Sequence, residues 1–483
     1  MKKSVAVSAI DSASTSIAAE VVEALRAEAT PGEEKRILRK IDFHIIPVMG
    51  FCYMLQYMGK VTLGYATQLS LRTDLDLHGS EYSWCSSVFY FGYFWSWPCS
   101  YISIWFPLGK YLGASVALWG AVLAIHAACA NFGGLLTARF FLGVTEAAVA
   151  PGFSLITGMF YKTSEQPSRM ALWFFGNAVA NIVSGLIAYG IGKIASNIAS
   201  WKLLFIILRC VTAAYRILLV FVLPDSDSPS KAWFLKPHER KIVVHRTVEN
   251  RTGVMDEGVF RADQMVGVLT DPQAWLLVRY SLTQNISNGV FSSFSSIIIN
   301  GFGFSELNSL LLSAPRGDPD YPHDCGLSFC ACRRILMNTL LGSNRWGRWA
   351  GIFLLGPFAT SIPISLSFIT SNVGGSTKKA TVSAMLFLAY CTGNIIGLQL
   401  FLDKEAPKYP TGLRGVIVGF SLAIFFLILL YIYYECENRR RDREYGPVPT
   451  ASRHQETETT GYVTEVEFIN RTDRQIPSFR YTL

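Results

Sequence analysis

Charged residues are scarce in this sequence. Asp, Glu, Lys and Arg make up 16% of its 483 residues, whereas a soluble domain carries about 25%. Apolar residues reach 51%, and the mean hydropathy is +0.30. With so few charges a soluble fold could not cover itself with polar surface, so the apolar residues must face lipid. The composition excludes a soluble multidomain protein and predicts an all-α polytopic membrane protein. It also argues against a nucleic-acid binder, despite a formal net charge of +8.

A disulfide framework is also missing. The ten cysteines are scattered singly, mostly inside apolar runs, whereas a secreted framework would pair them in polar loops. One group, made of His323, Cys325, Cys330 and Cys332, resembles a set of metal ligands, but its spacing fits no common zinc pattern. We therefore predict no metal and no cofactor.

Signals for enzymatic activity and for secretion are absent as well. The sequence has no Gly-rich phosphate loop, no His-rich metal cluster and no nucleophile elbow, so we do not expect an enzyme. The N-terminus opens with two lysines, but Asp11 and Glu20 interrupt its apolar run. This pattern is not a secretory signal, and the first membrane span would direct insertion instead.

Long apolar runs are what the sequence does contain. A helical span needs about 20 mostly apolar residues. Such runs occur near 45–66, 83–104, 113–131, 134–160, 171–192 and 203–223, and again near 275–299, 349–370, 380–402 and 414–434. The pattern predicts six spans, a polar stretch of about fifty residues, and four further spans.

Basic residues cluster in three places outside the spans: before the first span, in the central stretch, and directly after the last span. Because Lys and Arg concentrate on the cytoplasmic side of membrane proteins, both termini and the central loop are predicted to be cytoplasmic. Two bundles joined by such a loop are typical of secondary transporters. The sequence predicts five parts: an N-terminal tail (1–43), a six-helix bundle (44–223), a central loop (224–274), a C-terminal bundle (275–434) and a C-terminal tail (435–483). The C-terminal bundle is expected to be irregular at 305–348.

Arg139 and Glu146 are the sharpest candidates for chemistry inside a span. An ionisable residue there costs about 2.5–3.5 kcal/mol on insertion scales, so each one suggests a site. The two residues are seven apart, which places them on nearly the same helix face, roughly 10 Å apart along the axis. Arg139 could bind a substrate carboxylate, and Glu146 could take up and release a proton. Alternatively, Arg139 anchors the end of the span or forms a structural pair with Glu146.

Four further residues are weaker candidates for substrate binding. Lys60 could offer a second positive charge, or it could extend to the membrane interface. Asn177, Asn394 and Gln399 are neutral hydrogen-bonding groups beside small residues, and they could equally hold helices together. Arg209 and Arg216 have no acidic partner nearby in the sequence and suggest no function.

Several stretches together resemble a known family. They include LRKIDFHIIPVMGFCYMLQYMGK, RFFLGVTEAAVAPGF, WGRWAGIFLLGPF, SNVGGSTKKA and YCTGNIIGLQLFLDKEAPKYPTG, and they cover most of 33–435. They are similar to fungal allantoate-permease-like members of the anion:cation symporter branch of the major facilitator superfamily. The resemblance implies twelve helices in two bundles, a monomer in the fungal plasma membrane, and proton-coupled uptake of a small organic anion such as allantoate, nicotinate, pantothenate or a related carboxylate. It maps the family's substrate and proton residues onto Arg139 and Glu146, and a basic residue of its first helix onto Lys60.

The sequence departs from that family in two important places. Gly59 stands where the family usually carries Asp, so proton coupling would depend on Glu146. Within 316–348, polar sequence replaces the eighth helix and most of the ninth is missing, so the second bundle is expected to lack about two of its six helices. These departures leave an alternative function open, namely a transport-inactive, transporter-like sensor or a defective product.

Overall fold

The computed structural model describes residues 30–95, 108–162, 165–222, 232–248, 261–313, 346, 365, 368–369, 372–406, 409–446, 472–475 and 479–481. In its first half the helices are α2 (Pro31–Thr67), α3 (Leu71–Asp74), α4 (Glu81–Tyr93), α6 (Leu108–Ala128), α7 (Phe132–Glu146), α8 (Val149–Phe160), α9 (Gln166–Phe174), α10 (Gly176–Gly192) and α11 (Ser200–Val222). Then come α12 (Pro237–Val248) and α13 (Ala262–Leu269). The second half contains α14 (Pro272–Gly301), α15 (Glu306–Ser313), α19 (Ser376–Gln399), the 3-10 turn η3 (Asp403–Glu405) and α20 (Pro410–Tyr445).

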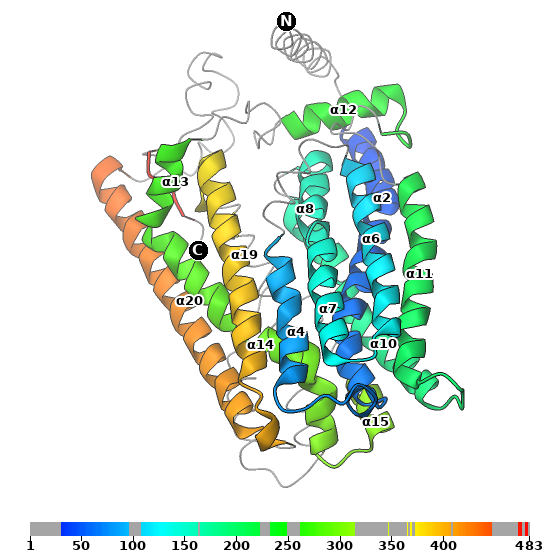
Figure 1. The fold of residues 1–483 in the computed structure, drawn as a ribbon. Helices are drawn as coiled ribbons and strands as arrows, with labels where there is room; N and C mark the ends of the chain where they lie inside the picture. Colours follow the sequence, from blue (N-terminus) through cyan, green and yellow to red (C-terminus); the bar gives the residue numbers. More distant parts are fainter. Residues whose placement is uncertain are drawn as a thin grey trace, which may run out of the picture.

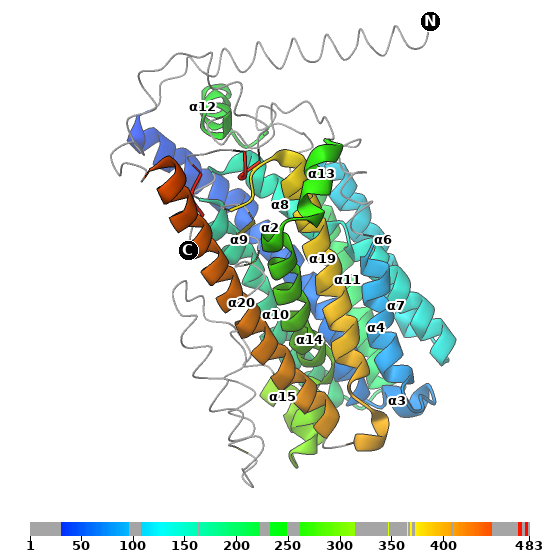
Figure 2. The same ribbon diagram turned by 90° about the vertical axis from the view of Figure 1, so that its left-hand side faces the viewer.

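The long helices form two bundles that stand side by side (Figures 1 and 2). In the first bundle α2 packs against α10 and α11, α4 against α7, and α6 against α11; in the second, α14 packs against α19 and α20. Five helical stretches of the described chain are long and apolar enough to cross a membrane by length and composition. No strand occurs among the described residues. The predicted all-α architecture of two bundles is confirmed.

Two ends of the molecule are distinguished below. The terminal end is where α2 begins, α20 ends and α12 lies, and the far end is where α3 and α15 lie (Figures 1 and 2). At the far end and toward it, six polar contacts join the two bundles, with distances between 2.7 and 3.4 Å. They are the pairs Tyr82–Ser293, Ser83–Phe401, Gly64–Ser296, Gln68–Asn300, Ser87–Gln399 and Arg72–Asp403.

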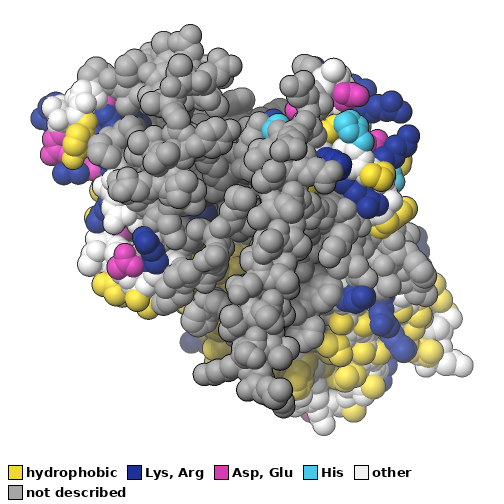
Figure 3. Space-filling view, turned by 90° about the horizontal axis from the view of Figure 1, so that it is seen from above, with side chains coloured by type: hydrophobic (Ala, Val, Ile, Leu, Met, Phe, Trp, Pro, Cys, Tyr) yellow, Lys and Arg dark blue, Asp and Glu magenta, His cyan; other side chains and the backbone are white. Residues whose placement is uncertain are grey.

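The terminal end is charged, and α12 docks there onto the first bundle. Lys40 Nζ lies 2.7 Å from Glu239 of α12, and Arg246 of α12 donates to Glu165 at 2.7 Å. His44 stacks on Phe234 just before α12, with ring centroids 4.9 Å apart. Seen from this end, Lys and Arg side chains gather around the rim of the molecule (Figure 3).

One predicted span has a break in its helical hydrogen bonding, while the backbone at the break stays in the right-handed helical region. The stretch 134–160 consists of α7 and α8, which are separated at Ala147 and Ala148. Pro151 explains the break, because it has no N–H to donate to the Ala147 carbonyl and its ring would clash with that carbonyl. Glu146 is consequently the last residue of α7, next to the break.

Helices α4 and α7 touch through their backbones. A Cβ on Gly143 of α7 would overlap the Phe89 carbonyl oxygen of α4 and lie 3.0 Å from the Tyr93 nitrogen. A Cβ on Gly92 of α4 would similarly overlap the Phe140 carbonyl oxygen. Only glycine permits this approach, which brings the aromatic residues of α4 close to Glu146.

Several predictions fall on parts of the chain outside the described residues. These are the group His323, Cys325, Cys330 and Cys332, most of the irregular segment 305–348, and most of the span 349–370.

Candidate functional site

Helix α7 directs Arg139 and Glu146 toward α2 in the first bundle. Arg139 is 2% exposed and Glu146 is 0% exposed, so both ionisable side chains are fully buried. The Arg139 Nη1 donates to the Gly59 carbonyl oxygen at 3.4 Å. The predicted pair therefore does share one face of its helix, and that face meets the segment of α2 that contains Gly59 and Lys60.

Gly59 makes room for the Glu146 carboxyl group. A Cβ at this position would lie 3.1 Å from Glu146 Oε1 and 3.6 Å from Trp119 Nε1. Any larger side chain would compete with both groups for this space. The departure noted in the sequence thus brings the backbone of α2 close to the one carboxyl group in this cluster.

Polar atoms without partners converge on this point. Both carboxyl oxygens of Glu146, the Nε and Nη2 of Arg139, and the Trp119 Nε1 are buried and accept or donate no hydrogen bond within the described part of the chain. Unsatisfied buried polar atoms are rare in proteins and call for an explanation, such as a ligand or an ion. Here two donor side chains, Arg139 and Trp119, and one carboxyl group lie around Gly59.

Lys60 lies against aromatic rings of α4. Its Nζ is 4.6 Å from the centroid of the Tyr93 ring and 5.3 Å from that of Phe89. These distances fit cation–π contacts, which partly compensate a buried ammonium group for lost water. Tyr93 in turn stacks on Phe387 of α19, with centroids 5.3 Å apart. Lys60 therefore lies where the second bundle meets the first.

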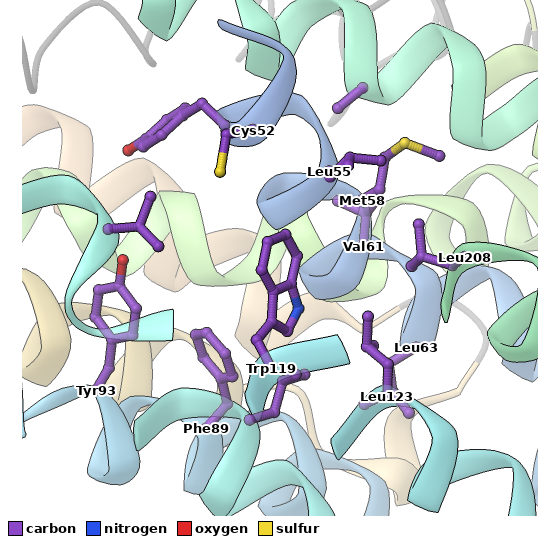
Figure 4. Close-up of a cluster of buried hydrophobic side chains, with 14 of the residues drawn as sticks. Cys52, Leu55, Met58, Val61, Leu63, Phe89, Tyr93, Trp119, Leu123 and Leu208 are labelled. Atoms are coloured by element: carbon purple, nitrogen blue, oxygen red, sulfur yellow. The ribbon is translucent and has the colours of Figure 1, made fainter. Parts of the chain in front are cut away.

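Three residues that the sequence analysis did not single out complete the cluster. Gln56 donates to the Tyr93 hydroxyl at 3.0 Å and to the Glu146 backbone carbonyl at 3.2 Å, so it links α2, α4 and the end of α7. Trp119 of α6 lies beside Phe89 and points toward α2 (Figure 4). A glutamine inside an apolar run was a signal that could have revealed Gln56, whereas nothing in the pattern around Trp119 and Tyr93 distinguishes them from core residues.

The three amide candidates lie elsewhere, and two of them form hydrogen bonds between helices. The Asn394 Oδ1 accepts from Asn288 of α14 at 3.0 Å, and Gln399 donates to Ser87 of α4 at 2.9 Å. Asn177 accepts through its backbone oxygen from Asn181, and its Oδ1 is buried without a hydrogen-bond partner in the described chain. These contacts favour helix packing for Asn394 and Gln399, while Asn177 keeps a free acceptor.

The arginines of α11 give no further site. Arg209 and Arg216 are exposed on the outer face of α11, away from the cluster. Within the described residues, no group of three His, Cys, Asp or Glu side chains could hold a metal ion.

Comparisons with known proteins agree with this architecture. The model of the Major Facilitator Superfamily matches residues 49–316. The allantoate permease of Saccharomyces cerevisiae is 34% identical, over 95% of this chain and 89% of its own length. An uncharacterized transporter of Schizosaccharomyces pombe is also 34% identical, over 94% of this chain and 87% of its own length. The thiamine pathway transporter THI73 of S. cerevisiae is 29% identical, over 92% and 86%.

Solved structures share the fold at low sequence identity. The crystal structure of a D-xylose-proton symporter superposes with a TM-score of 0.58 at 13% identity, over 80% of this chain and 96% of that one. A bacterial homolog of the human lysosomal transporter Spinster, in an inward-facing conformation, superposes with a TM-score of 0.56 at 12% identity, over 83% and 96%. With its two helical bundles and these relatives, the chain belongs to the Major Facilitator Superfamily and is a membrane transporter of small substrates, not an enzyme.

Proposed function

We propose that this transporter takes up a small organic anion together with a proton. The substrate class is allantoate, nicotinate, pantothenate or a related carboxylate. One observation carries the proposal: the fully buried Glu146 has both carboxyl oxygens unpartnered, beside the buried Arg139 and the half-buried Lys60. Similarity to an allantoate permease over most of the chain supports an anionic substrate.

The charges of the cluster explain how a proton and an anion would bind together. Lys60, Arg139 and an ionised Glu146 sum to a single positive charge, and protonation of Glu146 leaves two positive charges for the anion. One unit charge at roughly 6 Å and an effective dielectric of about 20 is worth about 3 kcal/mol, or about 100-fold in affinity. Because coupling between two ligands is reciprocal, a bound anion would raise the affinity for the proton equally.

Alternating access would carry this site from one side of the membrane to the other. The two bundles are joined toward the far end, and the basic start of α2, helix α12 and the basic end of α20 lie at the terminal end. We propose that the terminal end, with 1–43, 224–274 and 435–483, faces the cytoplasm of a fungal cell. We further propose that the protein works as a monomer in the plasma membrane.

Uptake by a yeast strain that lacks its own organic-anion permeases tests the proposal. Cells producing the protein should accumulate labelled carboxylate faster as the external pH falls, because protonation of Glu146 favours anion binding. Glu146→Gln should abolish the pH dependence, since the amide cannot exchange a proton. The control Glu435→Gln alters a carboxylate on α20 that pairs with the exposed Arg439, and it should behave like the unaltered protein.

The alternative, a transport-inactive sensor or a defective product, has two sequence observations in its favour: glycine in place of the family's aspartate at position 59, and the polar sequence within 316–348 where the family has helices. No uptake of any of these acids, despite full surface expression, would reject the transport proposal and favour this alternative.

A further inference from the structure

The end of the chain folds back onto the second bundle. Residues 472–475 and 479–481, here called the C-terminal clasp, contact the terminal ends of α14, α19 and α20. In Figure 1 they are the short red segments near α13 and the upper end of α20. About 25 residues separate the clasp from the end of α20, so its position is not imposed by chain connectivity.

Asp473 is the centre of the clasp. It is 0% exposed, and its carboxylate forms an ion pair with Lys378 of α19. Its Oδ1 also accepts from the Gly374 backbone N–H at 3.2 Å, and its Oδ2 accepts from the Tyr481 hydroxyl at 2.7 Å. Burial of a carboxylate is costly unless it is paired and hydrogen-bonded. These partners therefore indicate that Asp473 binds specifically at this position.

The charges of the clasp complete a buried network. Lys378 lies between Asp473 and Asp271, whose Oδ2 is 2.6 Å from the Lys378 Nζ, and Arg474 lies 3.0 Å from the other Asp271 oxygen. The network therefore holds two carboxylates and two cations. Without the clasp, Lys378 and Asp271 would each lose one of their two ion-pair partners, and the space over them would open to water.

The second anchor of the clasp lies on α20. Arg441 is 3% exposed and donates at 3.0 Å to the backbone oxygens of both Asp473 and Phe479. Asn438 exchanges two hydrogen bonds with the backbone of Tyr481, at 2.8 and 2.9 Å. The Tyr481 ring stacks on Tyr434, with centroids 4.9 Å apart.

We propose that the C-terminal clasp holds the terminal ends of α14, α19 and α20 as one rigid unit, and that transport requires this unit. Helices α14 and α19 are the members of the second bundle that pack against α2 and α4 of the first. The clasp links the starts of these two helices, because Asp271 precedes α14 and Lys378 lies in the first turn of α19. The clasp therefore sets the spacing between α14 and α19, the two helices that move relative to the Arg139–Glu146 cluster when one bundle rotates against the other.

Covalent lysine footprinting tests the clasp without any substrate. The purified full-length protein is treated with an acetylating N-hydroxysuccinimide ester, and the modification rate of each lysine is followed by mass spectrometry. Lys378 should react at least about tenfold more slowly than the exposed Lys35 at the same end, because the clasp covers it. In a chain that ends at Asn470, the two rates should come within about threefold of each other. Protection of Lys378 in the shortened chain would overturn the proposal.

Two neighbouring arginines supply a matched pair in the full-length chain. Arg441→Ala removes the donor to Asp473 and Phe479, whereas Arg439→Ala removes an exposed arginine side chain that donates to Glu435. Arg441→Ala should raise the reactivity of Lys378 and Arg439→Ala should not; equal effects would contradict the proposal. Lys40, which pairs with Glu239 in the first half, should keep its rate in each variant and so reports an intact fold.

Uptake measurements then test the functional half of the proposal, which rests on the proposed function. The chain ending at Asn470 and Arg441→Ala should each lose at least about fivefold in uptake rate at equal surface expression. Full uptake by a variant whose Lys378 has become reactive would show that transport does not need the clasp. If even the full-length protein takes up none of the acids, the proposed substrate class fails, and the footprint alone decides whether the clasp closes.

Discussion

The close contact between α4 and α7 predicts that the same glycine-to-alanine substitution destabilises the fold at one position and stabilises it at another. Gly143→Ala adds a methyl group where the Phe89 carbonyl oxygen of α4 already stands. Gly158→Ala adds the same group on α8, where no atom outside its own helix lies within 4 Å. The two variants therefore make one chemical change in two opposite surroundings.

The magnitudes follow from two opposing effects. Alanine stabilises a helix interior by roughly 0.5–1 kcal/mol relative to glycine. Overpacking a tight contact costs about 1–3 kcal/mol, and the backbone carbonyl of Phe89 cannot rotate away as a side chain would. Gly143→Ala should therefore lose about 1–2 kcal/mol net, while Gly158→Ala should gain up to about 1 kcal/mol.

Thermal stability in detergent measures this difference. Both variants carry a fluorescent protein at the N-terminus, which leaves the C-terminal clasp free, and the fraction that stays monodisperse is followed against temperature. The midpoint should fall by several degrees for Gly143→Ala and stay level or rise for Gly158→Ala. An unchanged midpoint for Gly143→Ala would refute the inference that the two backbones touch.

Three further predictions concern the site and the contacts toward the far end. Arg139→Lys keeps the charge but loses the guanidinium geometry, so the KM for the anion should rise about tenfold or more; Arg209→Lys, on the outer face of α11, should leave uptake kinetics unchanged. Tyr93→Leu removes the ring beneath Lys60 and should raise KM by about 2- to 30-fold, because a cation–π contact is worth roughly 0.5–2 kcal/mol, whereas Tyr93→Phe keeps the ring and should change KM less. Gln399→Leu breaks the hydrogen bond to Ser87, so thiol labelling of Ser86→Cys, at the buried neighbour of Ser87 on α4, from the far end should be about 2- to 10-fold faster than with Gln399 present. Unaltered labelling would argue against a role of that bond in closing the far end.

Parts of the candidate site were predictable from local pattern. Arg139 and Glu146 are seven residues apart, and two helical turns bring such a pair to one face wherever the helix lies. The cost of ionisable groups in lipid singled out both residues and Lys60. The grouping of Lys60 with the pair was not predictable in this way, because Lys60 and Arg139 are 79 positions apart in the chain and α3, α4 and α6 lie between them.

Gly59 illustrates what a departure from a family pattern can and cannot reveal. The sequence shows that a carboxylate expected there is missing, which by itself suggests the loss of a proton-coupling group. The structure shows that the vacated space lies 3.1 Å from Glu146 Oε1 and 3.6 Å from Trp119 Nε1, so the glycine also shapes the cluster. Similarly, Asp473 and Arg474 look like ordinary charged residues of a polar tail, and only their partners on α14, α19 and α20 reveal the clasp.

Hydropathy and charge along the chain by themselves determined the membrane class, the positions of most spans and the basic terminal end. They could do so because the cost of moving a segment into lipid depends on its own composition and length. Which helices touch and which buried charges find partners were decided only by the tertiary structure. Those outcomes depend on distances between residues far apart in the chain, and short-range side-chain contacts, not segment composition, set their energies.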